Sequence, residues 1–124
     1  MQRVRFPTSR PVLAGKEEQY VLEALHSGWI SGHGPFTRRF EKAVGDFLDL
    51  PDGIAVNSGT AALQLALRCL EVGPESEVIV PALTFVACPN AVHYCGGTPV
   101  FADCHPLTRN LTPETIEAAL TPKT

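Results

Sequence analysis

The chain has 124 residues, of which 44% are hydrophobic and 19% charged, and its formal net charge is −3 at pH 7. This composition is that of one ordinary globular domain, and the negative charge argues against a nucleic-acid-binding surface. No apolar run approaches the ~20 residues that a membrane-spanning helix needs, and the N-terminus lacks the apolar core of a signal peptide. We therefore expect a cytoplasmic protein with no membrane or nucleic-acid partner.

Two helices are predicted in the first 50 residues. In the first, Lys16–His26, the residues Val21, Leu22 and Leu25 share one face, and Ser27-Gly28 ends the helix. A glycine-rich loop at 28–35 follows and is a candidate for contact with a partner chain. The second helix is amphipathic and runs to about residue 48, with four apolar residues at helical spacing: Phe36, Phe40, Val44 and Phe47.

The stretch from Gly53 to Leu70 predicts a short buried strand, a polar turn and a helix. Ile54–Val56 is a brief apolar run, Ser58 is an N-cap residue type, and Gly59 permits a backbone conformation that side chains resist. The residues that follow are strong helix formers with one narrow polar stripe, so we expect this helix to be largely buried.

The start of this helix is a potential phosphate site. A helix that begins on Ser-Gly-Thr-Ala offers unpaired N–H groups and the positive end of its dipole. An ordinary capped helix without a ligand is the alternative interpretation. The turn is neither a Walker loop, since no Lys follows the glycine, nor a G-x-G-x-x-G fingerprint.

The remainder of the chain predicts two more strands and two more helices. The strands are 77–80 and 98–102, and the residues from 84 to 92 should become helical, with Pro89 in the first turn or at a kink. Gly96-Gly97 closes that helix, and a last helix begins at Thr112-Pro113 and runs to about Leu120.

The predicted order is therefore a β-α-β-α-β-α core preceded by two helices, which is an α/β fold with parallel strands and right-handed crossovers. Ligands of such sheets gather at the carboxyl ends of the strands. Three segments leave those ends here: 57–60, 82–85 and 103–105. The four cysteines lack C-x-x-C spacing and the four histidines are scattered, so no metal site is expected.

At these residues the sequence resembles the start of the pyridoxal-phosphate (PLP) sugar aminotransferases, the DegT/DnrJ/StrS family. The resemblance covers essentially the whole chain and is carried by four ordered signatures: Ser27-Gly28-Trp29-Ile30 with Gly34-Pro35 and Phe40-Glu41, Asn57-Ser58-Gly59-Thr60-Ala61-Ala62-Leu63, Glu77 to Ala87, and Gly97 to Asp103 with Asn110-Leu111-Thr112-Pro113. Any one of them would be weak evidence, but four in register are specific.

The resemblance implies the fold of the fold-type I (aspartate aminotransferase-like) enzymes, with residues 1–124 forming a single incomplete domain, the N-terminal part of the PLP-binding large domain. It implies that Ser58, Gly59 and Thr60 form the phosphate turn and that Phe85 lies against the pyridine ring. An aromatic face suits a flat cationic ring, and a helix start suits a dianion. The alternative for Phe85 is a core residue.

Transamination also requires a Lys that forms a Schiff base with the cofactor and an acid at the ring nitrogen. The lysines of this chain are Lys16, Lys42 and Lys123, and none matches the family's catalytic position. Asp103 does not match the ring-nitrogen acid. We therefore assign no catalytic residue, and we expect this chain alone to be inactive and to be marginally stable or to associate.

The implied activity is transfer of an amino group, with glutamate as the expected donor, to a nucleotide-linked keto-sugar in polysaccharide or antibiotic-sugar biosynthesis. The full-length form is expected to be a homodimer. The alternatives are a sugar dehydratase of the same family, a truncated and inactive remnant, and a generic nucleotide-binding α/β domain. The four ordered signatures argue against the last.

Overall fold

The structure is a computed structural model, and it describes residues 9–51 and 53–124. The chain divides into two compact units, one ending at Ala55 and the other beginning at Val56. Within the described residues, no helix has both the length and the apolar character needed to cross a membrane.

The first unit contains α1 (Glu17–Ser27) and α2 (Pro35–Leu48). Gly28 ends α1 in a left-handed conformation with φ of 76°, and its N–H donates to the carbonyl of Leu25. Glycine adopts this backbone conformation without the penalty that a Cβ imposes, so the predicted stop at Ser27-Gly28 is confirmed.

An aromatic and charged cluster joins α1 to α2. The rings of Tyr20 and Phe36 lie 5.7 Å apart between centroids, and the guanidinium of Arg39 lies 5.2 Å and 4.9 Å from them, respectively. Arg39 also forms an ion pair with Glu23 at 3.6 Å. Because one planar cation contacts two rings and a carboxylate, the helix pair is fixed in register by side chains.

The strand predicted at Ile54–Val56 does not form. The N–H of Gly53 donates to the carbonyl of Glu41, at 3.3 Å, and the N–H of Ala55 donates to the Glu41 carboxylate, at 2.8 Å. Ile54 is 76% exposed. A strand exists only beside a strand that completes its hydrogen-bond ladder, and here the backbone donors are satisfied by α2 instead.

The second unit begins with α3 (Gly59–Cys69), and the prediction that this helix is largely buried is wrong. None of its residues is buried, and Leu63 and Leu65 remain 40% and 39% exposed. The helix packs mainly on α4 (Ala87–Tyr94). The Arg68 guanidinium donates to the carbonyl of Tyr94, at 3.3 Å, and ties the two helices together.

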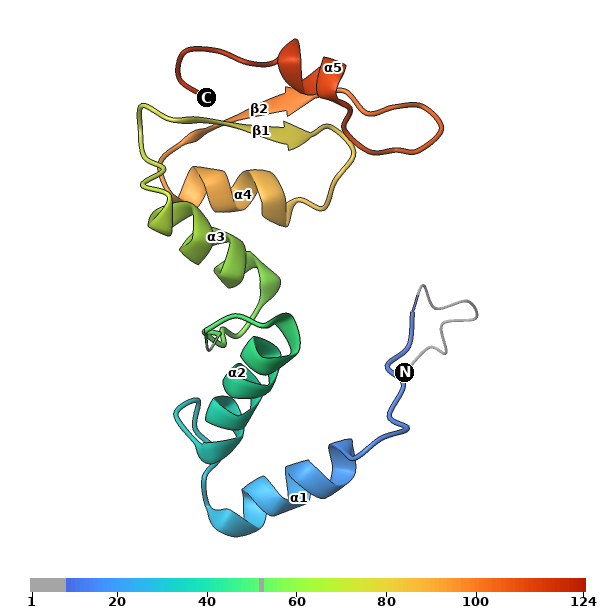
Figure 1. The fold of residues 1–124 in the computed structure, drawn as a ribbon, viewed down its shortest axis with the longest axis vertical. Coiled ribbons are helices and arrows are strands. Elements are labelled where there is room, and N and C mark those ends of the chain that lie inside the picture. Colours follow the sequence, from blue (N-terminus) through green and yellow to red (C-terminus); the bar gives the residue numbers. More distant parts are fainter. Residues whose placement is uncertain (1–8, 52) are drawn as a thin grey trace, which may run out of the picture. The chain divides into compact units, whose positions relative to one another are not determined.

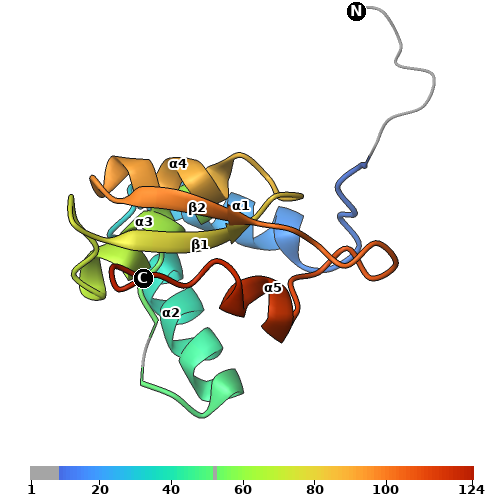
Figure 2. The ribbon, with the colours of Figure 1, turned by 90° about the horizontal axis from the view of Figure 1, so that it is seen from above.

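Two parallel strands, β1 (Glu77–Pro81) and β2 (Thr98–Ala102), pair with Glu77 opposite Thr98 and Pro81 opposite Ala102. The helix between them, α4, contacts both strands, and α5 (Pro113–Glu117) follows β2. Figures 1 and 2 show α4 on one face of the strand pair and α5 on the other. This is the predicted parallel β-α-β arrangement, reduced to two strands.

The core of the second unit lies between α4 and the strands. Its buried apolar residues are Val80, Ala91, Val92, Cys95 and Ala102. Pro89 is the third residue of α4, so it lies in the first turn, where its missing N–H costs no intrahelical bond. The tight turn at Gly96, with φ of 86°, returns the chain from α4 to β2.

The last helix is shorter than predicted. The Thr112 hydroxyl accepts the N–H of Thr115 and the Thr115 hydroxyl accepts the N–H of Thr112, which makes a reciprocal cap with Pro113 at the first helical position. The start of α5 is therefore as predicted, but the helix ends at Glu117 rather than near Leu120.

Candidate functional site

The candidate site lies where the second unit presents the ends of its elements. In Figure 1, β1 and β2 end on the same side on which α3 and α4 begin. The segments expected at the strand ends, 82–85 after β1 and 103–105 after β2, are both on this side. Right-handed parallel connections place the strand ends and the helix starts together, which is why ligands bind at this edge of α/β sheets.

Ser58 caps α3. Its backbone is extended, with φ of −162° and ψ of 157°, and its hydroxyl oxygen accepts the N–H of Ala61 at 3.2 Å. The carbonyl of Ser58 accepts the first intrahelical bond, from Ala62 at 3.0 Å. The Ser58 side chain therefore satisfies one donor of the first turn and leaves the earlier donors unsatisfied.

The amide groups of Gly59 and Thr60 are those remaining donors. Among the described residues, neither of these N–H groups has a protein hydrogen-bond partner, and the Thr60 hydroxyl has none either. A Cβ built on Gly59 would meet no heavy atom within 4 Å apart from its chain neighbours and the backbone of its own helix, so the space beside Gly59 is open. Two free amides, one hydroxyl and the positive helix end fit a dianionic phosphate group.

Phe85 lies in the segment between β1 and α4, and its side chain is 78% exposed. In the described structure Phe85 is therefore not a core residue, which was the alternative interpretation. A large aromatic face open to solvent beside the strand ends can contact a flat ring.

Sequence reasoning missed one contact beside Phe85. The Thr84 hydroxyl donates to Cys88 Sγ at 3.3 Å, which links the segment after β1 to the first turn of α4. The four-residue spacing of Thr84 and Cys88 was the available signal, because side chains four apart meet when the chain turns into a helix.

The segment after β2 is closed by its own hydrogen bonds. Asp103 Oδ1 accepts the N–H of Cys104 at 2.8 Å, and His105 Nδ1 accepts the N–H groups of Leu107 and Thr108, both at 3.3 Å. The Asp103 carboxylate is thus engaged in its own loop. Groups of three or more His, Cys, Asp or Glu side chains that could hold a metal ion do not occur in the described part of the chain.

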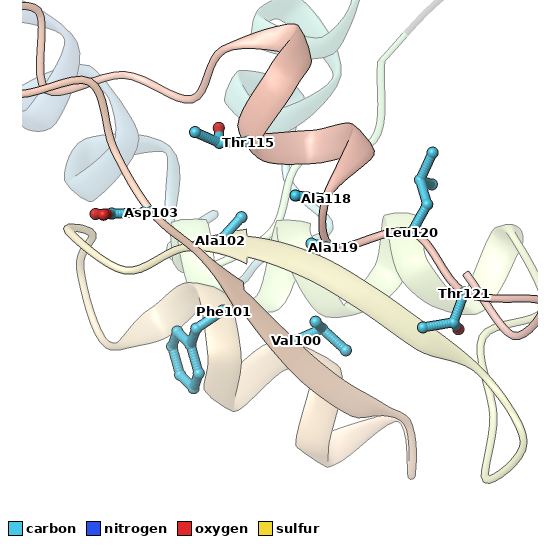
Figure 3. Close-up of a pocket in the computed structure, with 9 residues that line it drawn as sticks. All are labelled: Val100, Phe101, Ala102, Asp103, Thr115, Ala118, Ala119, Leu120 and Thr121. Atoms are coloured by element: carbon cyan, nitrogen blue, oxygen red, sulfur yellow. The ribbon is translucent and has the colours of Figure 1, made fainter.

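A recess of about 450 Å³ lies between β2 and the α5 segment (Figure 3). Figure 3 shows Ala102 directed toward α5 and Phe101 directed away from it. The two threonine hydroxyl groups that line the recess already have partners. Thr115 Oγ1 donates to the carbonyl of Thr112, and Thr121 Oγ1 donates to the Glu77 carboxylate. This apolar recess with engaged polar groups is a poorer candidate for an anionic ligand than the start of α3.

Of the chain's lysines, Lys123 belongs to the second unit, which carries the candidate site. Lys16 precedes α1 and Lys42 pairs with Asp46 on α2, at 2.7 Å, both in the first unit. Lys123 forms an ion pair with Glu75 at 3.5 Å, and its carbonyl accepts the N–H of Glu77 at the amino end of β1. Lys123 is therefore at the opposite end of the strand from Phe85.

Comparisons with known proteins identify the family of this chain. A family model for the DegT/DnrJ/EryC1/StrS aminotransferases matches residues 11–124. GDP-perosamine synthase of Caulobacter vibrioides is 48% identical over 120 residues, which are 97% of this chain and 32% of that protein. The spore coat polysaccharide biosynthesis protein SpsC of Bacillus subtilis is 46% identical over 118 residues, 95% of this chain and 30% of that protein.

Solved structures show the same relationship. Spr1654 of Streptococcus pneumoniae, assigned as a sugar aminotransferase and solved in its PLP form, matches with a TM-score of 0.86 and 40% identity, over 96% of this chain and 30% of that one. 3-Amino-5-hydroxybenzoic acid synthase matches with a TM-score of 0.83 and 38% identity, over 96% and 31%. These likenesses confirm the α/β, fold-type I expectation, and the chain spans about a third of the length of the relatives it matches.

Proposed function

This chain belongs to the DegT/DnrJ/EryC1/StrS aminotransferase family, whose members use PLP, and from that premise we propose that it is the N-terminal part of the PLP-binding large domain of a sugar aminotransferase. The proposed reaction moves an amino group from an amino-acid donor, glutamate, to a nucleotide-linked keto-sugar. The resemblance supplies the two substrate classes, and the name of the GDP-perosamine synthase relative supports a nucleotide-linked sugar.

The observation that carries this proposal is the open start of α3. The free amides of Gly59 and Thr60, together with the Thr60 hydroxyl, would hold the cofactor phosphate, and Ser58 keeps the helix end in shape. Phe85 would lie against the pyridine ring, where its exposed face excludes water from one side. When bound, PLP supplies an electron sink for chemistry at the amino carbon.

We also propose that this chain by itself binds the cofactor but does not catalyse transamination. Its support is that none of the lysines matches the family's catalytic position, and that Lys123, in the unit that carries the site, lies at the far end of β1. A sugar dehydratase of the same family remains the second candidate, because the residue that separates the two activities is not among those described here. A homodimer of the full-length form is part of the proposal by resemblance.

Pyridoxamine 5′-phosphate provides the test, because it is fluorescent and binds without a lysine linkage. We expect saturable binding to the 124-residue chain, competition by inorganic phosphate, and weaker binding by about tenfold in Thr60→Ala and in Phe85→Ala, since each loses one hydrogen bond or one ring contact. Thr98→Ala and Phe47→Ala are matched controls, since Thr98 is exposed at the amino end of β2 and Phe47 is exposed on α2. Absence of binding, or equal losses in the control variants, would overturn the proposal.

A further inference from the structure

The segment that carries Phe85 is held at both of its ends by backbone hydrogen bonds. At its start, the N–H of Ala82 donates to the carbonyl of Ala102 at 2.9 Å, which continues the β1–β2 ladder by one residue. At its end, the N–H of Cys88 donates to the carbonyl of Phe85 at 3.0 Å. Phe85 is thus exposed at its ring and restrained at its backbone.

Pro89 explains why the second restraint comes from Cys88. In a regular helix the carbonyl of Phe85 would accept from the residue four positions later, which is Pro89, and proline has no N–H. The carbonyl accepts instead from the residue three positions later, Cys88, and the regular pattern resumes with Asn90 donating to Val86 at 3.2 Å. The backbone of Phe85 therefore depends on Cys88 alone at this point.

The Cys88 side chain adds a second restraint on the neighbouring residue. Thr84 Oγ1 donates to Cys88 Sγ at 3.3 Å, so Cys88 contacts Thr84 through its sulfur and Phe85 through its amide. Cys88 is half-buried, whereas Thr84 and Phe85 are exposed. A half-buried residue thus anchors two exposed neighbours, and among the described residues the Thr84 side chain makes no hydrogen bond other than the one to Cys88.

We infer that Cys88 is a positioning residue that holds the Thr84–Phe85 turn and thereby sets the direction of the Phe85 ring toward a bound flat cofactor. This inference rests on the proposed function, since it assumes that Phe85 contacts the cofactor ring. Cys88 itself touches no reacting atom. A protein whose binding-competent turn is only partly populated binds its ligand more weakly by that fraction, so loosening the turn lowers affinity.

The first experiment measures the turn without any ligand, by hydrogen exchange at the amide of Cys88 in the 124-residue chain. Cys88→Ala removes the sulfur acceptor and Thr84→Val removes its donor, and each should speed exchange at this amide by about fivefold, the effect of one modest hydrogen bond. Cys88→Ser retains an acceptor and should exchange like the wild type. Cys69→Ala, on an exposed cysteine of α3, is the matched control and should leave this amide unchanged.

The second experiment asks whether the turn acts through the ring, by titrating the same variants with pyridoxamine 5′-phosphate. Cys88→Ala should weaken binding by about fivefold and Cys88→Ser by less than about twofold, and Thr84→Val combined with Cys88→Ala should be no worse than either alone, because both remove the same contact. In a Phe85→Ala background, Cys88→Ala should have no further effect on the affinity. General destabilisation of the unit would weaken binding in both backgrounds.

The outcomes separate the two proposals. If the wild-type chain does not bind pyridoxamine 5′-phosphate, the proposed function fails, while exchange at the Cys88 amide still reports whether the sulfur contact holds the turn. Unchanged exchange in Cys88→Ala would overturn the positioning role even if the probe binds. Faster exchange with unchanged affinity, or an equal loss of affinity in the Phe85→Ala background, would also overturn it.

Discussion

Gly97 lies against Val72 so closely that a Cβ on the glycine would be 2.9 Å from Val72 Cγ1, and the same Cβ would be 3.2 Å from Val92 Cγ1. Gly97 is buried at the entry to β2, between the end of α3 and the core face of α4. Two branched side chains thus fill the space that a larger residue would need, and real Cβ atoms essentially never approach to 2.9 Å.

Gly97→Ala should therefore lower the free energy of unfolding by about 1–3 kcal/mol, the usual cost of overpacking a core. The measurement is urea unfolding followed by circular dichroism. Gly73→Ala is the matched control, because its Cβ would meet only the Glu71 carbonyl oxygen, at 3.9 Å. Equal effects of the two substitutions would contradict this reading of the core.

Ser58→Asp should separate folding from phosphate binding. Aspartate retains an oxygen that accepts the N–H of Ala61, and its charge favours a helix start, so the free energy of unfolding should not fall. The same charge beside the amides of Gly59 and Thr60 should weaken pyridoxamine 5′-phosphate binding by about tenfold or more through repulsion of the phosphate. Unchanged affinity would mean that the phosphate binds elsewhere.

Thr112→Ala should lower the free energy of unfolding by about 0.5–2 kcal/mol, because it removes the hydroxyl that accepts the N–H of Thr115. Thr112→Ser keeps the hydroxyl and should cost much less. The pKa of the Glu114 carboxyl is lowered, first by a hydrogen bond with the Thr112 side chain and then by one with the backbone of Glu114. A carboxyl whose pKa is lower in the folded state stabilises the fold at pH values above its unfolded pKa, and this stabilisation is lost as the pH falls. The stability advantage of the wild type over Thr112→Ala should therefore shrink on acidification below about pH 4.

Phe47→Glu should reduce self-association of the 124-residue chain. Phe47 is 87% exposed and Phe40 on the same helix is 61% exposed, and exposed aromatic side chains favour association. Sedimentation velocity over a range of concentrations measures the effect. Ser31→Glu adds the same charge in an exposed loop and should leave association unchanged, whereas a monomeric wild type at all concentrations would contradict the expectation.

The local features of this fold were predictable because each is decided by a few adjacent residues. Gly28 ends a helix, Thr112-Pro113 begins one, and Pro89 lies in a first turn for reasons of backbone geometry that need no distant contact. The parallel pairing of β1 and β2 also followed from the order of elements, since a helix crossover leaves few other topologies.

The errors concern features that depend on distant neighbours. Ile54–Val56 has the composition of a buried strand, but no strand lies beside it, and its backbone bonds to Glu41 instead. The apolar face of α3 was expected to be buried, yet α4 is the element that packs on it, so Leu63 and Leu65 remain partly exposed. Burial depends on what surrounds a helix, and the helix's own residues indicate only which of its faces can be buried.

For the candidate site, sequence alone determined which chemical groups are available. A Ser-Gly-Thr helix start carries its hydrogen-bond donors, and an aromatic residue carries its ring, wherever they fold. The four ordered signatures also identified the family from sequence. Tertiary structure alone decided that the corner at Gly59 is open, that Phe85 is exposed, and that Cys88 reaches back to Thr84. The physical reason is that amide donors and side-chain types are local, whereas open space and contact are set by atoms that the chain brings together only on folding.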